Sequence, residues 1–124
     1  ANSYNEQDDY PDFVHVAAQK VAENSKENRA IVLGGSGQGE AMVANRYKGV
    51  RAMVFYGGAP ELAMISRIHN DSNILSLAAA PSINITEAQP MSDELAQKVV
   101  KLWLDTPFTN EARHRRRINK IDPQ

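Results

Sequence analysis

The sequence predicts one α/β domain, built as a three-layer, open parallel sheet with helices on both faces. Short apolar runs, typical of buried strands, alternate with segments in which apolar residues recur every three or four positions, as in amphipathic helices. The segments between them are short, which favours parallel strands joined through helical crossovers. The chain has 124 residues, 42% of them hydrophobic and 23% charged, which matches a single compact domain over residues 1–124.

The first part of the chain contains two predicted helices with a strand between them. Pro11 suits the first turn of a helix, and apolar residues then recur at helical spacing until Asn24. Residues 30–33 are wholly apolar and lead into glycines, which predicts a strand buried on both faces of the sheet. A second helical pattern covers residues 39–47 and is stopped by the Lys-Gly pair at 48–49.

The middle of the chain repeats the order strand, helix, strand. Residues 51–56 and 73–78 are mostly apolar and predict two further strands. Between them, a helical pattern begins near Pro60 and ends at residues 69–70. Residues 79–91 contain two prolines and no convincing period, so we interpret them as a long loop.

The last part of the chain is predicted to be helical. Ser92 suits the N-cap of a helix with acidic residues in its first turn, and this helix ends before Pro107. Residues 111–121 are strongly charged and predict a last helix or an extended tail. With only three evident strands, the expected result is a small Rossmann-like sheet followed by a C-terminal helical tail.

The composition excludes several classes of function. The chain has no cysteine, so it offers no disulfides, no thiolate metal ligands and no thiol nucleophile. No apolar run reaches the roughly 18 residues of a membrane span, and the polar, acidic N-terminus is unlike a signal peptide, so the expected location is the cytoplasm. The net charge of −1 combines an acidic start with a basic end, which favours a local anion site over a globally basic protein.

The clearest candidate site is the segment 34–40, Gly-Gly-Ser-Gly-Gln-Gly-Glu, which lies between a predicted strand and a predicted helix. Such a turn offers backbone N–H groups to an anion at the carboxyl end of a parallel sheet. It fits neither a dinucleotide fingerprint nor a Walker loop. Glu40 can act beside these N–H groups as a general base that moves a proton between adjacent sugar carbons. A tight turn without chemistry remains the alternative, because the helix dipole alone also favours a carboxylate there.

Further segments occur in a recognisable order along nearly the whole chain, from about Asp9 to Ile121. They are Asp-Tyr-Pro-Asp at 9–12, the loop 34–40 with Ala-Asn at 44–45, Gly-Val-Arg-Ala at 49–52, His-Asn-Asp at 69–71, Trp-Leu-Asp-Thr-Pro at 103–107 and Arg-His-Arg-Arg-Arg at 113–117. Together they resemble the ribose-5-phosphate isomerase B family, which also contains the galactose-6-phosphate isomerase subunits.

The resemblance implies an aldose–ketose isomerase that interconverts ribose 5-phosphate and ribulose 5-phosphate, or a close relative acting on another phosphosugar, without a metal or an organic cofactor. Many members have a catalytic cysteine at the position of Gly34, whereas another branch uses the glutamate that ends the loop. The chain resembles the second branch, which implies that Glu40 is the catalytic base. The loop residues would line the substrate and hold the enediolate oxygen with their amides: Gly35, Ser36, Gly37, Gln38 and Gly39.

The same resemblance implies roles for residues outside the loop. His69 would act as the acid that assists opening of the furanose ring, and Asn70 would bind a sugar hydroxyl. Arg113 and Arg117 are one helical turn apart, so both can face one phosphate. The family uses arginines here for the substrate phosphate, commonly across a dimer interface. The expected partners are therefore the phosphosugar and further copies of the chain, in a homodimer or a dimer of dimers, with no nucleic acid and no membrane.

The chain departs from the family pattern at its start, at Ala80 within the longer loop 79–91, and over residues 55–60. Members usually begin with a strand that ends in Asp-His-Ala-Gly, so we expect that an N-terminal strand and helix are missing from this sequence. Ala80 stands where the pattern generally has a phosphate-binding arginine. These departures leave open a non-catalytic phosphosugar-binding protein of the same fold. A nucleic-acid binder that uses the arginine-rich end is less favoured, because no aromatic stacking platform accompanies those arginines.

Overall fold

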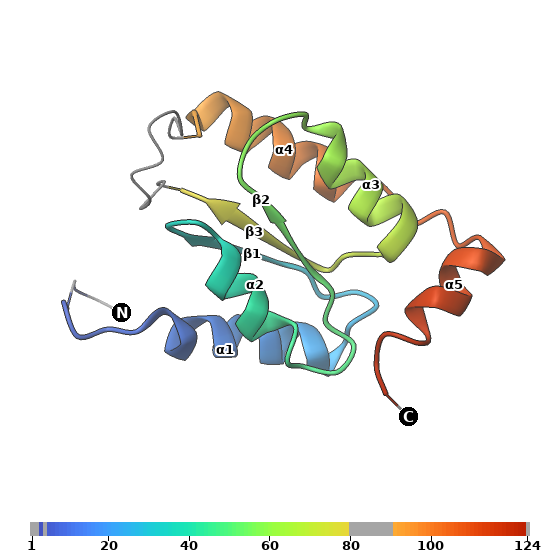
Figure 1. Ribbon diagram of the computed structural model, residues 1–124, viewed down its shortest axis with the longest axis horizontal. Helices are drawn as coiled ribbons and strands as arrows, with labels where there is room; N and C mark the ends of the chain where they lie inside the picture. Colours follow the sequence, from blue (N-terminus) through green and yellow to red (C-terminus); the bar gives the residue numbers. More distant parts are fainter. Residues whose placement is uncertain (1–2, 4, 80–90, 124) are drawn as a thin grey trace.

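The structure, a computed structural model, describes residues 3, 5–79 and 91–123. Its strands form one parallel sheet in the order β1-β3-β2. Figure 1 shows α1 and α2 on one face of the sheet, α3 and α4 on the other, and α5 beyond the end of α3. This arrangement confirms the predicted layered α/β fold. The elements are α1 (Tyr10–Glu23), β1 (Ala30–Gly34), α2 (Gln38–Ala44), β2 (Ala52–Phe55), α3 (Glu61–Asn70), β3 (Ile74–Ala78), α4 (Asp93–Asp105) and α5 (Ala112–Ile118).

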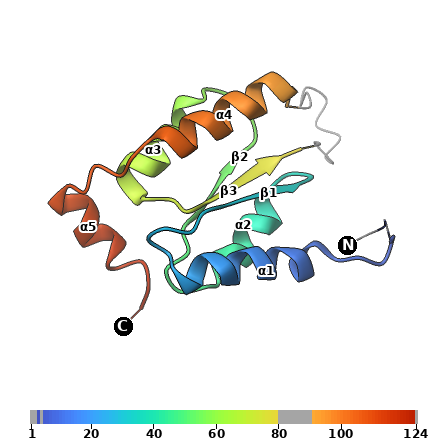
Figure 2. The same cartoon turned by 180° about the vertical axis from the view of Figure 1, so that it is seen from behind.

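Each face of the sheet has its own hydrophobic core. The core under α1 and α2 includes Val21, Ala44 and Ile74, which are fully buried. The core under α3 and α4 contains the largest buried side chains, Phe55 and Trp103. Figure 2 shows from behind that the two pairs of helices lie on opposite sides of the sheet. Because β3 is the middle strand and contributes to both cores, all of its residues are buried.

Strand β1 is less buried than its apolar sequence predicts. Val32 is buried, but Leu33 is 65% exposed, so the prediction of a strand buried on both faces is wrong for β1. The reason is topological, because among the described strands β1 pairs only with β3 and forms an edge of the sheet. An apolar run indicates a strand, but it does not indicate the position of that strand in the sheet.

Helix α2 ends at Ala44, before the predicted end at residue 47. The next residue, Asn45, donates from Nδ2 to the carbonyl of Ala52 at 3.0 Å and accepts at Oδ1 from the backbone N–H of Ala52 at 2.8 Å. The amide side chain thus pairs with the outer edge of β2 in the way that a neighbouring strand would. This long-range pairing accompanies the early turn of the chain away from the helix.

The remaining predicted elements are confirmed with small shifts of their ends. Helix α4 begins after Ser92, whose Oγ accepts a hydrogen bond from the backbone N–H of Leu95 at 3.2 Å, as an N-cap does. For residues 111–121 the structure decides between helix and tail, because α5 is helical and a turn follows it. Residues 80–90, which include Ala80 and most of the predicted loop, lie outside the described residues.

Candidate active site

The glycine loop leaves the carboxyl end of β1 and enters α2, as the sequence predicts. Gly37 has a φ of 73°, a left-handed conformation that glycine adopts without a steric penalty. Its carbonyl accepts a hydrogen bond from Ser76 Oγ at 2.6 Å, and a Cβ on Gly37 would lie 3.2 Å from the carbonyl carbon of Leu77. The loop is therefore packed directly on β3, and a side chain at this position would disturb that packing.

Glu40 lies in the first turn of α2 and is buried, with only 6% of its surface exposed. Its carboxylate turns back towards β1 and occupies the space beside the Cα of Gly34. A Cβ placed on Gly34 would overlap the carboxyl carbon and both carboxylate oxygens. The lack of a side chain at position 34 therefore makes room for the carboxylate inside the loop.

Tyr10 also borders the loop, although the sequence suggested no role for it. It is the first residue of α1, and an added Cβ on Gly39 would overlap the Tyr10 hydroxyl oxygen and lie 3.0 Å from Cε2 of the ring. The only signal in the sequence was the position of Tyr10 within the segment 9–12 of the family resemblance. Tyr10 thus adds a phenolic hydroxyl to the surroundings of the loop.

His69 and Asn70 are exposed residues at the end of α3. The ring of His69 stacks on the ring of His114, with the centroids 4.5 Å apart and 20° between the planes. His114 belongs to α5 and is buried. The stack joins the ends of two helices that are far apart in the sequence, and it limits the orientations open to the His69 ring.

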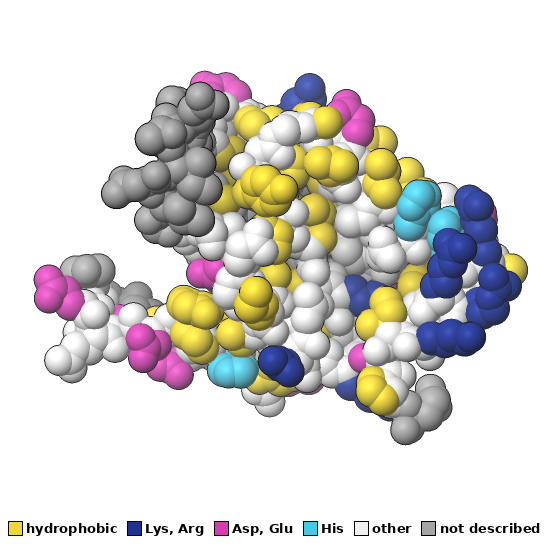
Figure 3. Space-filling model, in the orientation of Figure 1, with side chains coloured by type: hydrophobic (Ala, Val, Ile, Leu, Met, Phe, Trp, Pro, Cys, Tyr) yellow, Lys and Arg dark blue, Asp and Glu magenta, His cyan; other side chains and the backbone are white. Residues whose placement is uncertain are grey.

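Helix α5 carries the predicted phosphate-binding arginines next to this histidine pair. Arg113 and Arg117 are exposed and lie one turn apart on the helix. The Nε of Arg113 donates to Oε2 of Glu111 at 2.9 Å. Figure 3 shows basic side chains gathered at one end of the molecule, where α5 with its arginines lies, beside histidine side chains. This end of the molecule is a cationic surface suited to an anion.

The predicted site residues form two groups, one at the carboxyl ends of the parallel strands and the other at their amino ends. Glu40 and the loop follow the carboxyl end of β1, whereas α3 ends with His69 and Asn70 before the amino end of β3 (Figure 1). Strands β1 and β3 run parallel over five residues. At roughly 3.3 Å per residue, the amino and carboxyl ends of these strands are therefore about 13 Å apart. Glu40 and His69 of one chain therefore lie at opposite ends of the strands, separated by about the length of β3. A catalytic acid or base must come within about 3 Å of the proton it transfers.

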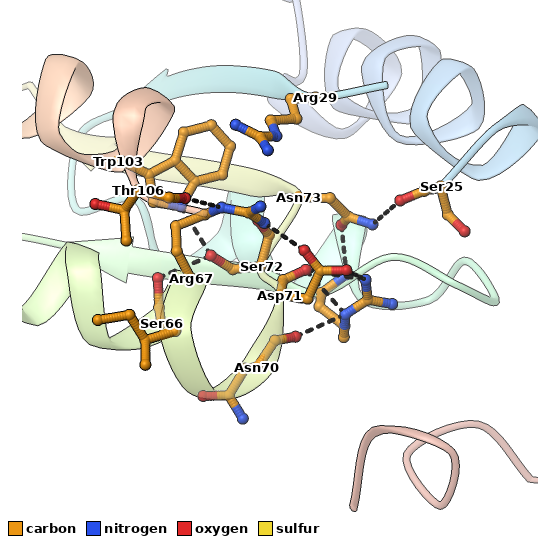
Figure 4. Close-up of polar contacts among 12 residues, drawn as sticks. Ser25, Arg29, Ser66, Arg67, Asn70, Asp71, Ser72, Asn73, Trp103 and Thr106 are labelled. Carbon is orange, nitrogen blue, oxygen red and sulfur yellow. Dashed lines mark hydrogen bonds and ion pairs between the residues drawn. The ribbon is translucent and has the colours of Figure 1, made fainter. Parts of the chain in front are cut away.

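The turn after α3 is held by a polar network that the sequence did not predict (Figure 4). Asp71 forms ion pairs with Arg51, which precedes β2, and with Arg67 of α3. Trp103 of α4 donates from Nε1 to Ser72 Oγ at 2.8 Å. The network joins the end of α3 to β2 and to α4, and it supports the backbone that carries the exposed histidine and asparagine.

The buried His114 predicts a pH dependence of stability. Burial lowers the pKa of its imidazole below the ordinary value of 6.5, His69 and Arg113 lower it further, and Glu111 opposes them. The folded protein therefore binds fewer protons at His114 than the unfolded chain does. The neutral His114 contributes fully to the stability of the fold above pH 6.5, and this contribution is lost as the pH falls through the lowered pKa. We expect the decrease of Tm below this pH to be weaker in His114→Gln. The exposed His15 provides the control, because His15→Gln should keep the wild-type pH profile; equal profiles in all three proteins would contradict the prediction.

Within residues 3, 5–79 and 91–123, no three His, Asp or Glu side chains lie close enough together to hold a metal ion. In the same part of the chain, no helix has both the length and the apolar character that crossing a membrane requires. The glycine loop and the cationic end near α5 therefore remain the candidate site.

Known sequences that resemble this chain include those of sugar-phosphate isomerases. The family described as Ribose/Galactose Isomerase matches residues 1–121. The probable ribose-5-phosphate isomerase B of Mycoplasma genitalium is 35% identical over 120 residues, which cover 97% of this chain and 71% of the relative. The ribose-5-phosphate isomerase B of Escherichia coli is 31% identical over 116 residues, which cover 94% of this chain and 69% of the relative. The chain thus spans about 70% of the length of these relatives.

Solved structures of such relatives have the same fold. The crystal structure of ribose-5-phosphate isomerase B from Mycoplasma genitalium with bound ribulose-5-phosphate aligns with a TM-score of 0.82 at 34% identity, over 98% of this chain and 72% of the other. The enzyme from Thermotoga maritima aligns with a TM-score of 0.77 at 38% identity, over 97% of this chain and 74% of the other. These likenesses agree with the family match along nearly the whole chain. The chain therefore belongs to the ribose/galactose isomerase family.

Proposed function

We propose that this protein is a sugar-phosphate isomerase that interconverts ribose 5-phosphate and ribulose 5-phosphate, or a closely related pair of phosphosugars, through an enediolate. The observation that carries the proposal is the buried carboxylate of Glu40, which fills the space beside Gly34 inside the glycine loop. Membership of the family supports the reaction class. The structure of the Mycoplasma genitalium relative with bound ribulose-5-phosphate supports the choice of substrate.

The proposed reaction begins when the sugar ring opens with His69 as the acid. Glu40 then removes the proton from the carbon next to the carbonyl group and returns it to the former carbonyl carbon, while the hydroxyl proton of the first carbon passes to the former carbonyl oxygen, so that a new carbonyl group forms. Negative charge develops on the carbonyl oxygen between these steps, and the backbone N–H groups of residues 35–39 are suited to stabilise it. Substrate and product are isomers, so the reaction needs neither an oxidant nor a reductant.

The second group of residues binds the rest of the substrate. Asn70 holds a sugar hydroxyl, and Arg113 and Arg117 hold the phosphate, for which the fork of the guanidinium group is well shaped. This group lies near the amino ends of the strands, whereas Glu40 lies near their carboxyl ends. We therefore propose that each site combines the loop of one copy with α3 and α5 of a second copy. A symmetric homodimer contains two such sites.

Heterodimers made from two differently tagged chains test this shared site. A dimer of a Glu40→Gln chain and an Arg117→Ala chain has one site with both residues intact, so we expect about half of the wild-type isomerase activity. A dimer of a wild-type chain and a chain with both substitutions has no intact site and should be inactive. The reverse pattern would mean that each site lies within one chain. Binding of ribose 5-phosphate without turnover by the wild-type protein would favour a non-catalytic phosphosugar-binding role.

A further inference from the structure

Asp71 follows α3 in a conformation that most residues avoid. Its φ and ψ are both 47°, in the left-handed region. Glycine is the usual residue at this position after a helix, because it has no Cβ to clash there. Among the described residues, only one other non-glycine residue, Asn110, has a positive φ. Aspartate adopts this conformation more readily than most residues, because its short polar side chain can form local hydrogen bonds. The partners of the Asp71 carboxylate therefore indicate what this residue contributes.

The carboxylate of Asp71 links two arginines from different parts of the chain (Figure 4). Oδ1 accepts a hydrogen bond from Nη1 of Arg67, one turn earlier on α3, at 2.7 Å. Oδ2 accepts a hydrogen bond from Nη2 of Arg51 at 3.2 Å. The arginine side chains are only 3% and 13% exposed, and that of Asp71 is 28% exposed. Solvent therefore screens these ion pairs less than pairs on the open surface.

Arg51 donates hydrogen bonds to the backbone at the end of α3. Its Nε donates to the carbonyl of Asn70 at 2.8 Å, and its Nη2 donates to the carbonyl of Asp71 at 2.9 Å. Its Nη1 reaches the carbonyl of Gly49, in the turn before β2, at 3.1 Å. The last carbonyls of a helix have no partner within the helix. Arg51 supplies that partner for the residue that we propose to bind the sugar hydroxyl.

Arg67 contacts the same turn and also α4 and the residue that follows it. Its guanidinium carbon lies 5.8 Å from the centroid of the Trp103 ring. Burial lowers the pKa of Arg67, the nearby Arg29 also lowers it, and Asp71 raises it. The carboxylate of Asp71 thus offsets part of the cost of burying this guanidinium. Arg67 also donates to two backbone carbonyls, those of Ser72 and Thr106.

We infer that Asp71, held between Arg51 and Arg67, is the positioning residue for His69 and Asn70. The inference rests on the proposed function, in which these two residues open the ring and bind the sugar. A helix that only had to end here would be served better by glycine. The carboxylate instead ties the last turn of α3 to β2 and α4, and so determines where the two preceding side chains point.

The first test compares two substitutions of Asp71. Asp71→Asn keeps the shape and tolerates the left-handed conformation but removes the charge, whereas Asp71→Gly removes the steric cost together with the carboxylate. We expect both variants to lower kcat/KM for ribose 5-phosphate by about 100-fold, the size of effect that a misplacement of about 1 Å produces, with KM increased as well as kcat reduced. Wild-type activity in Asp71→Gly would overturn the inference, because Asp71 would then serve only to end the helix.

The matched control is Asp105→Asn. It removes an exposed ion pair between Lys101 and Asp105 that has the same i, i+4 spacing as Arg67 and Asp71. We expect no change in kcat/KM. The near-ultraviolet circular dichroism of Trp103, the single tryptophan of the chain, reports whether each variant folds. If Asp71→Gly does not fold, the kcat/KM of Asp71→Asn tests the inference. This variant is expected to fold, because asparagine keeps a hydrogen-bond acceptor for the buried arginine.

The second test is an NMR measurement that does not depend on turnover. The chain has three histidines, so the ring signals of His69 are identified by their loss in His69→Gln. Because His69 stacks on His114 at 4.5 Å, its ring protons should be shifted by the ring current of His114. We expect this shift to disappear in Asp71→Asn, and unchanged His69 signals would overturn the inference. If the wild-type protein lacks isomerase activity, the proposed function fails, while these signals still decide the role of Asp71.

Discussion

Replacement of Glu40 by glutamine is expected to lower kcat for the isomerisation of ribose 5-phosphate by about 10²- to 10⁴-fold, the range that a positioned general base contributes. Glutamine has the shape of glutamate and fits the same space beside Gly34, but its amide does not accept a proton at neutral pH. KM should change little, because Glu40 is not among the proposed ligands of the phosphate or the sugar hydroxyls. A coupled assay over a range of substrate concentrations separates the two constants.

The matched control for this substitution is Glu23→Gln. Glu23 is the last residue of α1 and forms an exposed ion pair with Lys20 at 2.8 Å. Such surface pairs contribute little to stability, so the variant should keep the wild-type kcat and Tm. A Glu40→Gln protein that retains most of the wild-type rate would mean that another group is the base, and the proposed mechanism would be wrong.

A methyl group on Gly34 is expected to remove most of the activity without unfolding the protein. Gly34→Ala would place its Cβ where the Glu40 carboxylate now lies. The carboxylate is the end of a flexible side chain and can rotate away, so the backbone can stay in place and Tm should remain close to the wild-type value. The displaced carboxylate would no longer be directed at the substrate carbon, and kcat should fall by about 100-fold.

A double variant tests whether the two substitutions act through the same group. If Gly34→Ala acts by displacing the Glu40 carboxylate, its addition to Glu40→Gln should cause no further loss of activity. Two independent effects would multiply instead, and that result would contradict the role assigned to Gly34. Leu33→Ala is a control from the neighbouring position, because Leu33 is 65% exposed and its truncation should leave kcat unchanged.

Patterns among neighbouring residues predicted most of the fold. The strand at residues 73–78 and the N-cap at Ser92 were predicted from residues that are close together in the sequence, and the structure confirms both. Helical periodicity, apolar runs and caps are local features, so they are readable without knowledge of tertiary contacts. The glycine loop was recognisable for the same reason, since its amides and Glu40 lie within the single segment 34–40.

The features that the sequence did not predict depend on residues that are distant in the chain. Leu33 is exposed because β1 is an edge strand in the described sheet, and strand order depends on which strands pair. Asn45 leaves the helical pattern and pairs with the edge of β2. The stack of His69 on His114 requires that the ends of α3 and α5 meet. Neither propensity nor periodicity specifies these contacts.

The sequence by itself determined the layered α/β fold, the strand-loop-helix unit and the carboxylate at the end of the glycine loop. Only the tertiary structure decided that this carboxylate of Glu40 turns back against Gly34 and that His69 lies at the other end of the strands. The position of Asp71 between two arginines was also decided by the tertiary structure alone. The physical reason is that side-chain direction and the meeting of distant segments depend on how the helices pack on the sheet, which motif spacing along the chain does not encode.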